Sequence, residues 1–356
     1  MHIPDGYLSP QTEMVFGAAM VPVWYTATKK VRKVVKNKEV PLLAICAAFA
    51  FLIMMFNVPI PDGTTAHAVG AVLIAVLLGP WAATIAVSIA LATQALFFGD
   101  GGVLAFGANC FNMAFVMPFV GYGVYLALSR NLSLTTPKRA FAAGVGGYIG
   151  LNVAALCAAT EFGVQPVLFH TANGTPLYAP FHLAQTIPAM ALAHLTVAGL
   201  VEFVITTGVI AYLQRANLPI LRINHPNVPV TDEELERRRL PGWGWALLGL
   251  GVMIALVPLG LLAPGGAFGE DAPDKLNLAK YGLRTIPQGL NRFAGFWSHA
   301  VLGGYGFHDG DHPVIGYYVS AIVGILIIGG LIFLLMWLLR VLTRRGRTAS
   351  LGETAT

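Results

Sequence analysis

Long apolar segments, separated by short polar ones, run along most of the chain. A helix needs about 20 apolar residues to cross the ≈ 30 Å hydrocarbon core of a membrane, and nine segments approach this length. Their approximate bounds are 10–31, 40–57, 66–79, 81–98, 105–128, 138–162, 183–214, 242–262 and 314–342. The third is short, and Gly79-Pro80 predicts a tight turn into the fourth. The pattern predicts an all-α polytopic membrane protein with about nine transmembrane helices.

The composition agrees with lipid as the surrounding medium. Only 11% of the 356 residues are charged, against about 25% in soluble domains, and 56% are hydrophobic. The mean hydropathy is +0.68. So few charges cannot cover a soluble surface, which excludes a soluble fold, a disordered chain and a nucleic-acid binder. The three cysteines lie in separate apolar runs, which argues against a disulfide framework or a zinc–thiolate site.

Basic residues are distributed unevenly between the two faces of this arrangement. Eighteen of the 22 Lys and Arg residues follow the first, fifth, seventh or ninth segment, and these positions all fall on one face. The positive-inside rule identifies that face as cytoplasmic and places the N-terminus outside. The net charge of +5 therefore orients the protein in the membrane. The other four basic residues lie in a long outer loop, where the positive-inside rule is weak: Lys275, Lys280, Arg284 and Arg292.

The segments divide into two groups. Seven precede a polar linker, and two follow it on either side of an outer loop of about fifty residues. A loop that long is usually functional. The expected parts are a seven-helix capture domain (1–218), a cytoplasmic linker (219–241), a two-helix C-terminal domain (242–345) and a cytoplasmic tail (346–356). In the first domain, the spacing of Gly146 and Gly150 predicts a close contact between helices.

The first two residues, Met1 and His2, form a candidate metal chelate. No cleavable signal peptide is visible, so we expect them to remain on the mature protein. The free amine, the backbone nitrogen of His2 and its imidazole can bind one ion through fused small rings. Three nitrogens in a plane suit Ni²⁺ or Cu²⁺, and Co²⁺ less strictly. Taken alone, a histidine near an N-terminus is more often merely solvated or frayed.

His67 is a candidate fourth nitrogen ligand. It follows a Pro- and Gly-rich outer loop and lies at the outer end of the third segment, on the same side of the membrane as Met1. A histidine that merely packs at the membrane interface is the alternative.

Few other polar residues lie inside the apolar segments. Gln94, Asn109 and Asn112 fall near the outer ends of two segments, where they could orient a metal-binding loop. His194 and Glu202 share one segment but are about 12 Å apart along a helix. Ionisable groups in membranes are costly, so a role in pairing helices or in moving protons is open for both.

The outer loop offers a further, auxiliary metal-binding candidate in His308 and His312, which flank two acidic residues. The chain lacks the GxxxxGK[ST], HExxH and GxSxG motifs. It is therefore not expected to bind ATP through a P-loop or to act as an enzyme.

Several of these stretches resemble the CbiM/NikM substrate-capture components of energy-coupling-factor transporters for cobalt and nickel. The resemblance begins with Met1-His2-Ile3-Pro4-Asp5-Gly6 and extends to about residue 218. The C-terminal domain is similar to the small two-span N component, although Lys275 and Asn277 replace the usual Gly and Glu of a PDGLE-type motif. The similar stretches in the first domain are 1–10, 65–73, 78–83, 94–102, 107–113 and 179–181, with His194 and Glu202.

The resemblance implies a function, a location and partners. Met1, His2 and His67 would form a near-planar four-nitrogen site for Ni²⁺ or Co²⁺, which is the transported ion and not a cofactor. The protein would lie in a bacterial or archaeal cytoplasmic (inner) membrane. It would act with a transmembrane coupling subunit (the T component) and two ATPase subunits (A components). The outer loop would approach the metal-binding loop and assist loading.

A self-sufficient secondary transition-metal permease is the alternative function. Such a permease would be expected to show paired ionisable residues near the membrane midplane, and often inverted repeats. The ligand types do not distinguish nickel from cobalt, and by themselves also admit copper.

Overall fold

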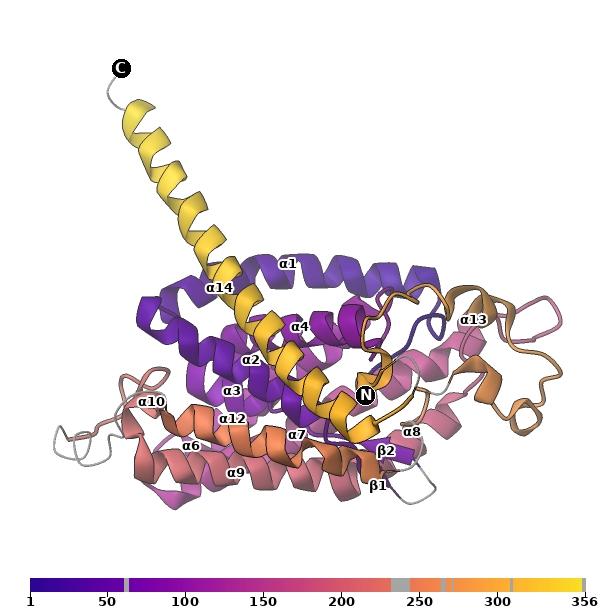
Figure 1. Ribbon diagram of the computed structural model, residues 1–356, viewed down its shortest axis with the longest axis horizontal. Coiled ribbons are helices and arrows are strands. Elements are labelled where there is room, and N and C mark those ends of the chain that lie inside the picture. The colour runs from indigo at the N-terminus through magenta and orange to yellow at the C-terminus, as the bar shows by residue number, and fades with distance from the viewer. Residues whose placement is uncertain (61–63, 232–243, 264–266, 271, 308–309, 354–356) are drawn as a thin grey trace.

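The protein is a largely helical, multi-pass membrane protein (Figure 1). The structure is a computed structural model, which describes residues 1–60, 64–231, 244–263, 267–270, 272–307 and 310–353. Its one sheet in this part of the chain is a hairpin of β1 (Val58–Ile60) and β2 (Thr64–Ala66), in which Pro59 pairs with Thr65. The charged stretch of the expected linker, 232–241, lies outside the described residues.

Each of the nine apolar segments contains a helix. The α-helices are α1 (Pro10–Val34), α2 (Val40–Met54), α3 (Ala71–Leu78), α4 (Pro80–Thr93), α5 (Phe106–Asn109), α6 (Met117–Ser129), α7 (Pro137–Leu168), α8 (Leu183–Ala193), α9 (Gly199–Ala216), α10 (Leu218–Arg222), α12 (Gly244–Leu256), α13 (Gln288–Phe293) and α14 (Pro313–Glu353). Short 3₁₀ turns are η1 (Asn37–Glu39), η5 (Val257–Leu262), η6 (Pro273–Lys275), η7 (Leu278–Tyr281) and η8 (Gly303–Tyr305).

Three π-helical turns interrupt the apolar helices. They extend α4, join α5 to α6 and join α8 to α9, as η2 (Gln94–Phe98), η3 (Cys110–Val116) and η4 (His194–Ala198). Each contains a polar residue that stands out in the sequence: Gln94, Asn112 or His194. π-Turns are rare and often occur at functional sites, so they mark these three positions for closer inspection.

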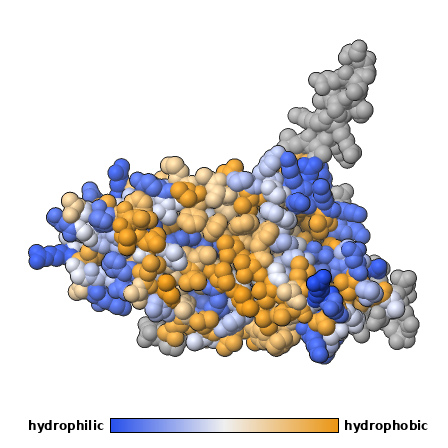
Figure 2. Space-filling view, turned by 180° about the vertical axis from the view of Figure 1, so that it is seen from behind, coloured by the Kyte–Doolittle hydropathy of each residue, from blue (hydrophilic) through white to orange (hydrophobic). Residues whose placement is uncertain are grey.

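Among the described residues, five helical stretches are long and apolar enough to cross a membrane. They are Pro80–Phe98, Phe106–Ser129, Pro137–Leu168, Leu183–Ala216 and Pro313–Val341. Val40–Met54 and Ala246–Leu262 are shorter apolar helices. Large apolar side chains point outwards from several of these helices, among them Phe141, Val204 and Leu326. Figure 2 shows hydrophobic residues covering most of the middle of one face, with hydrophilic residues gathered towards its ends.

The third apolar segment differs from its prediction. A helix was expected over 66–79, but α3 has only eight residues, about 12 Å of rise, too short to cross a membrane. Residues 67–70 before it have no regular structure. These residues are buried, and buried backbone outside a helix must find hydrogen-bond partners within the protein. Side chains distant in sequence provide them.

Glu202 and Asn224 cap the two ends of α3. Oε2 of Glu202 accepts hydrogen bonds from the backbone N–H groups of Val69 and Gly70, at 2.9 and 3.0 Å. At the other end, Nδ2 of Asn224 donates to the carbonyl oxygen of Ala75 at 3.0 Å. A carboxylate at a helix N-terminus also interacts favourably with the helix dipole. These contacts give Glu202 a structural role between α9 and α3.

Glycines let α7 pack closely against its neighbours. A Cβ at Gly146 would lie 2.4 Å from the carbonyl oxygen of Gly121, and one at Gly150 would lie 2.7 Å from that of Met117. Both partners belong to α6, which confirms the predicted helix contact. Small residues at such crossings are typical of membrane bundles.

The C-terminal part packs on the first domain and covers its outer end. α12 and α14 pack against α2, and α14 also packs against α4. The backbone N–H of Leu302 donates to the carbonyl of Phe97 at 3.0 Å, and Gly289 does the same to Leu177 at 2.7 Å. Figure 1 shows the N-terminus, the hairpin and α13 towards one end of the molecule and α10 at the other.

Candidate metal centre

The N-terminus of the chain is buried inside the protein. Met1 and His2 are each 3% exposed, and Ile3 is fully buried. Chain termini are usually among the least ordered parts of a domain. A buried terminus with a histidine beside its amine is therefore a specific structural feature.

Hydrogen bonds to the loop before α5 and to α5 itself hold the N-terminal segment in place. The N–H of Ile3 donates to Oδ1 of Asn109 at 2.8 Å, and the carbonyl of Ile3 accepts from Nδ2 of the same side chain at 3.0 Å. That carbonyl also accepts from the N–H of Gly102 at 2.8 Å. A Cβ on Gly102 would lie 2.3 Å from a carboxylate oxygen of Asp5, so only glycine fits there.

His67 lies next to His2. The two ring centroids are 4.9 Å apart and the ring planes are tilted by 32°. Nδ1 of His67 donates to the carbonyl of Ala68 at 3.1 Å, which leaves Nε2 with its lone pair. Nε2 of His67 and Nε2 of His2 are both buried and have no hydrogen-bond partner within the described part of the chain.

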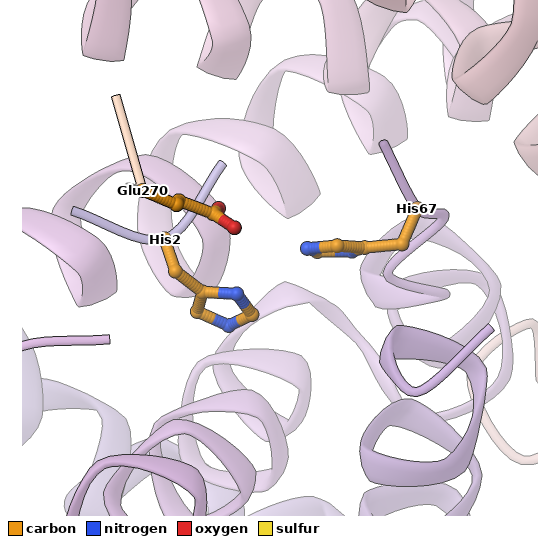
Figure 3. Close-up of side chains that lie close together, drawn as sticks. All are labelled: His2, His67 and Glu270. Carbon is orange, nitrogen blue, oxygen red and sulfur yellow. The ribbon is translucent and has the colours of Figure 1, made fainter. Parts of the chain in front are cut away.

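A carboxylate from the C-terminal part completes the cluster. Oε1 of Glu270 lies 3.3 Å from the nitrogen of Met1. One ligand atom from each of His2, His67 and Glu270 lies within 4.8 Å of the others, and Figure 3 shows the three side chains converging. The sequence predicted neutral nitrogen donors here, and the structure adds an acidic oxygen.

A second set of contacts links the outer loop to His2 through Asp100. Nδ1 of His2 donates to Oδ1 of Asp100 at 3.1 Å. Oδ2 of Asp100 accepts from the Tyr305 hydroxyl and, at 3.3 Å, from Nε2 of Gln94. Gln94 also donates to the Tyr305 oxygen at 2.8 Å. The orientation of the His2 ring is thus tied to a tyrosine about 300 residues away in sequence.

Tyr305 is held firmly in this position. Its ring stacks on Phe98 at 5.2 Å, and its backbone φ of 62° is a conformation that costs a non-glycine residue about 1–2 kcal/mol. Burial, and then the carboxylate of Asp100, raises the pKa of the Tyr305 hydroxyl well above its usual range. The hydroxyl therefore remains a hydrogen-bond donor at any physiological pH.

The pKa of the His67 imidazole is lowered well below its ordinary value. The first cause is burial, followed by the positive N-terminal amine and the nearby rings of His2 and His194. His67 precedes α3 and lies outside the apolar helices that cross the membrane. Its imidazole is accordingly neutral and available as a nitrogen donor.

The other residues expected at the site have different surroundings. Asn109 holds the N-terminal segment, and Gln94 contacts Asp100. Asn112 points elsewhere, because its Nδ2 donates to Glu161 on α7 at 2.9 Å. His312 is exposed directly before α14 and does not belong to the His2–His67–Glu270 cluster. His308 lies outside the described residues.

Three residues at the site did not stand out in the sequence. Asp100 resembles an ordinary turn residue in Gly99-Asp100-Gly101-Gly102, and Tyr305 and Glu270 lie in a loop without a recognisable motif around them. A motif of glycines around one acidic residue was the available signal for Asp100. For the other two, only the packing of the outer loop reveals the contact.

His194 lies near His67 but does not belong to the His2–His67–Glu270 cluster. Its Nδ1 donates to the carbonyl of Met190 at 2.8 Å, and Nε2 is buried without a partner among the described residues. The β-hairpin packs against η4, which contains His194.

Comparison with known proteins identifies relatives over the whole chain. The family described as "Cobalt uptake substrate-specific transmembrane region" (CbiM) matches residues 2–219. The fused nickel transport protein NikMN of Rhodobacter capsulatus is 46% identical over 357 residues, covering 97% of this chain and 99% of that protein. The probable fused nickel transport protein LarMN of Lactiplantibacillus plantarum is 47% identical over 332 residues, covering 92% and 95%.

Solved structures match the first part of the chain. The crystal structure of a truncated transition metal transporter is 63% identical, with a TM-score of 0.56, and covers 60% of this chain and 98% of its own. A second crystal structure, described as a transition metal transporter, has the same sequence identity and TM-score. The match covers 60% of this chain and 92% of that one. The chain therefore belongs to the CbiM family and, like its fused relatives, continues past the CbiM region into a further C-terminal part.

Proposed function

We propose that this protein is the substrate-capture subunit of an ATP-driven energy-coupling-factor importer for Ni²⁺ or Co²⁺. The observation that carries the proposal is the buried N-terminus, whose amine and His2 lie beside the unpartnered Nε2 of His67. The names of the fused relatives, which refer to nickel transport, support the choice of ion.

The proposed site binds the ion through four nitrogens. The Met1 amine and the His2 amide nitrogen close a five-membered ring with the metal, and the amide and Nδ1 of His2 close a six-membered ring. Nε2 of His67 supplies the fourth nitrogen. Metal–nitrogen distances of about 2.0–2.1 Å are usual for such ligands. Nδ1 of His2 must leave Asp100 to bind, so Asp100 competes with the metal for this nitrogen.

The energy for transport is proposed to come from separate subunits. The sequence contains no P-loop motif, so a transmembrane coupling subunit and two ATPase subunits are the expected partners. A proton-coupled permease would need an ionisable residue free to exchange protons in the membrane. Glu202, one of the two candidates in the sequence, is occupied by two backbone N–H groups, which argues against it as the proton carrier.

Uptake of radioactive nickel or cobalt into cells that lack their own uptake systems tests this proposal. We expect uptake when this chain is expressed together with its coupling and ATPase subunits. An ATPase variant without hydrolytic activity should abolish uptake and leave metal binding to this chain intact. Sustained uptake by this chain alone would contradict the proposal and support a secondary permease.

Glu202→Ala is expected to destabilise the protein and weaken metal binding together. The change leaves two buried N–H groups without an acceptor, at a cost of about 1–3 kcal/mol each. It also frees the backbone directly after His67. Thermal unfolding in detergent and metal titration would measure the two effects.

Glu202→Gln is the matched control, because its amide oxygen can still accept from α3. We expect it to retain most of the stability and binding. If Glu202→Gln instead abolished transport while stability and binding stayed at wild-type values, Glu202 would be a proton carrier and not a cap.

Metal affinity is expected to fall steeply with decreasing pH. Binding displaces one proton from the His2 amide and, where the amine is protonated, a second from the amine, so the apparent dissociation constant should rise by at least about tenfold for each unit by which the pH falls. The lowered pKa of His67 keeps its imidazole neutral over this range, and it adds no further proton. Calorimetry in buffers of different ionisation enthalpy counts the released protons. Release of no proton would exclude the deprotonated amide as a ligand.

A further inference from the structure

We infer that Glu270 is an additional metal ligand, which supplies an oxygen donor from the C-terminal part to the N-terminal site. The inference rests on the proposed function, because it assumes that an ion binds between Met1, His2 and His67. It assigns to the outer loop a direct bond to the ion.

The distances in the cluster already suit a common ion. Two ligands about 2.1 Å from one metal lie about 3.0 Å apart when adjacent and about 4.2 Å apart when opposite. Oε1 of Glu270 is 3.3 Å from the Met1 nitrogen, close to the separation of adjacent ligands. The donor atoms of Glu270, His2 and His67 lie within 4.8 Å of one another, so small shifts of Glu270 and His67, together with the release of Nδ1 of His2 from Asp100, would bring them around one ion.

Packing fixes the position of the carboxylate. Residues 267–270 form a turn closed by a 2.9 Å hydrogen bond from the N–H of Glu270 to the carbonyl of Ala267. Phe268 in this turn packs on Phe181 with ring centroids 5.0 Å apart. Glu270 therefore reaches the site from an anchored turn and not from a freely moving chain.

The geometry of the chelate leaves the Glu270 oxygen only the positions outside the plane of the four nitrogens. The fused rings hold the amine, the amide and the His2 imidazole in one plane, and His67 occupies the remaining in-plane position. A fifth ligand can only approach from above or below that plane. Glu270 belongs to a different segment from all four nitrogens, and Figure 3 shows its carboxylate directed at the space between the two rings.

The charge of Glu270 is also consistent with a ligand role. Its side chain is only 20% exposed, and its observed partner is the positive N-terminus. The nearby carboxylate of Asp100 has a different partner, because it accepts a hydrogen bond from Nδ1 of His2. A divalent ion bound at the amine would take over as the positive partner of the Glu270 carboxylate.

An axial oxygen changes which ions the site prefers. A planar set of four nitrogens suits Cu²⁺ and planar Ni²⁺, whereas Co²⁺ and six-coordinate Ni²⁺ accept further oxygen ligands. Glu270 would thus shift the preference of the site away from Cu²⁺. This gives the C-terminal part a role in selecting the ion.

Two single variants test the inference: Glu270→Gln removes the proposed ligand, and Asp274→Asn is its control. Asp274 is exposed in the same loop, so its substitution removes the same charge away from the site. Full-length proteins with an unmodified Met1 would be loaded with Ni²⁺, Co²⁺ or Cu²⁺ in detergent. X-ray absorption counts the atoms bound to the metal, and competition titrations give the relative affinities.

We expect Glu270→Gln to bind Co²⁺ and Ni²⁺ about 10–100-fold more weakly, a range typical of losing one supporting group at a metal site. Its Cu²⁺ affinity should change by less than about threefold, and Asp274→Asn should match the wild type. The wild-type Ni²⁺ spectrum should show one oxygen neighbour more than that of Glu270→Gln.

A planar four-nitrogen Ni²⁺ spectrum in the wild type would overturn the inference, even if Glu270→Gln failed to fold. Equal losses for all three ions would also overturn it, because Glu270 would then be only the counter-ion of Met1. A wild type that bound none of these ions would instead contradict the proposed function.

Discussion

Adding one residue in front of Met1 is expected to abolish high-affinity metal binding. The extension converts the Met1 amine into an amide, so Met1, His2 and His67 can no longer supply the proposed set of one amine, one amide and two imidazole nitrogens. It also forces an extra residue into a space where Met1 is 3% exposed and its nitrogen already contacts Glu270. We expect the affinity for Ni²⁺ and Co²⁺ to fall by at least about a thousandfold, equivalent to about 4 kcal/mol.

The control for this experiment is the extended protein after its original N-terminus has been restored. An extension that a protease removes to leave an authentic Met1 should recover one bound ion per chain after cleavage. One residue added after Thr356 should have no effect on binding. Stoichiometric binding by the uncleaved protein that was still lost on His67→Ala, measured by elemental analysis after gel filtration, would exclude the Met1 amine as a ligand.

His67→Ala has the second largest expected effect. The substitution removes the fourth nitrogen and leaves a hole in a site where His67 is 3% exposed. We expect the loss of stoichiometric Ni²⁺ or Co²⁺ binding, with an affinity at least about 100-fold weaker, which is about 2.7 kcal/mol. Titration against a competing chelator of known affinity would measure the change.

His170→Ala is the matched control for His67. His170 is an exposed histidine in the connection after α7, and its Nδ1 donates to the carbonyl of Thr171 at 2.9 Å. Its loss should leave the affinity unchanged. If both variants bound metal like the wild type, His67 would be a packing residue as in the alternative interpretation.

Much of the fold could be predicted from the sequence, because lipid imposes long apolar segments. The helices over 106–129, 183–216 and 313–341 agree with their predictions to within a few residues. α3 could not be predicted, since its length depends on Glu202 and Asn224, which lie far away in sequence. An apolar run does not reveal that distant side chains cap its ends.

The part of the site whose ligands are adjacent in sequence could be predicted. Met1 and His2 are neighbours in sequence, so their chelate needs no knowledge of the fold. The carboxylate of Asp100, the hydroxyl of Tyr305 and the carboxylate of Glu270 reach His2 and Met1 only through packing of the outer loop. No periodicity or spacing encodes contacts between residues so far apart.

Glu202 illustrates how an isolated ionisable residue can mislead. In the sequence it is a charged group inside an apolar helix, which suggests proton movement as readily as structure. In the structure it accepts two backbone N–H groups just after His67 and so positions a proposed ligand. The distinction depends on which groups surround the carboxylate.

A crystal structure of the Ni²⁺-loaded protein with an unmodified Met1, phased at the nickel absorption edge, would locate the ion directly. We expect one strong anomalous peak, about 2.0–2.2 Å from the Met1 amine, the His2 amide, Nδ1 of His2 and Nε2 of His67. A peak elsewhere, with Met1 still paired to Glu270 and His2 to Asp100, would contradict capture of the metal by the N-terminus.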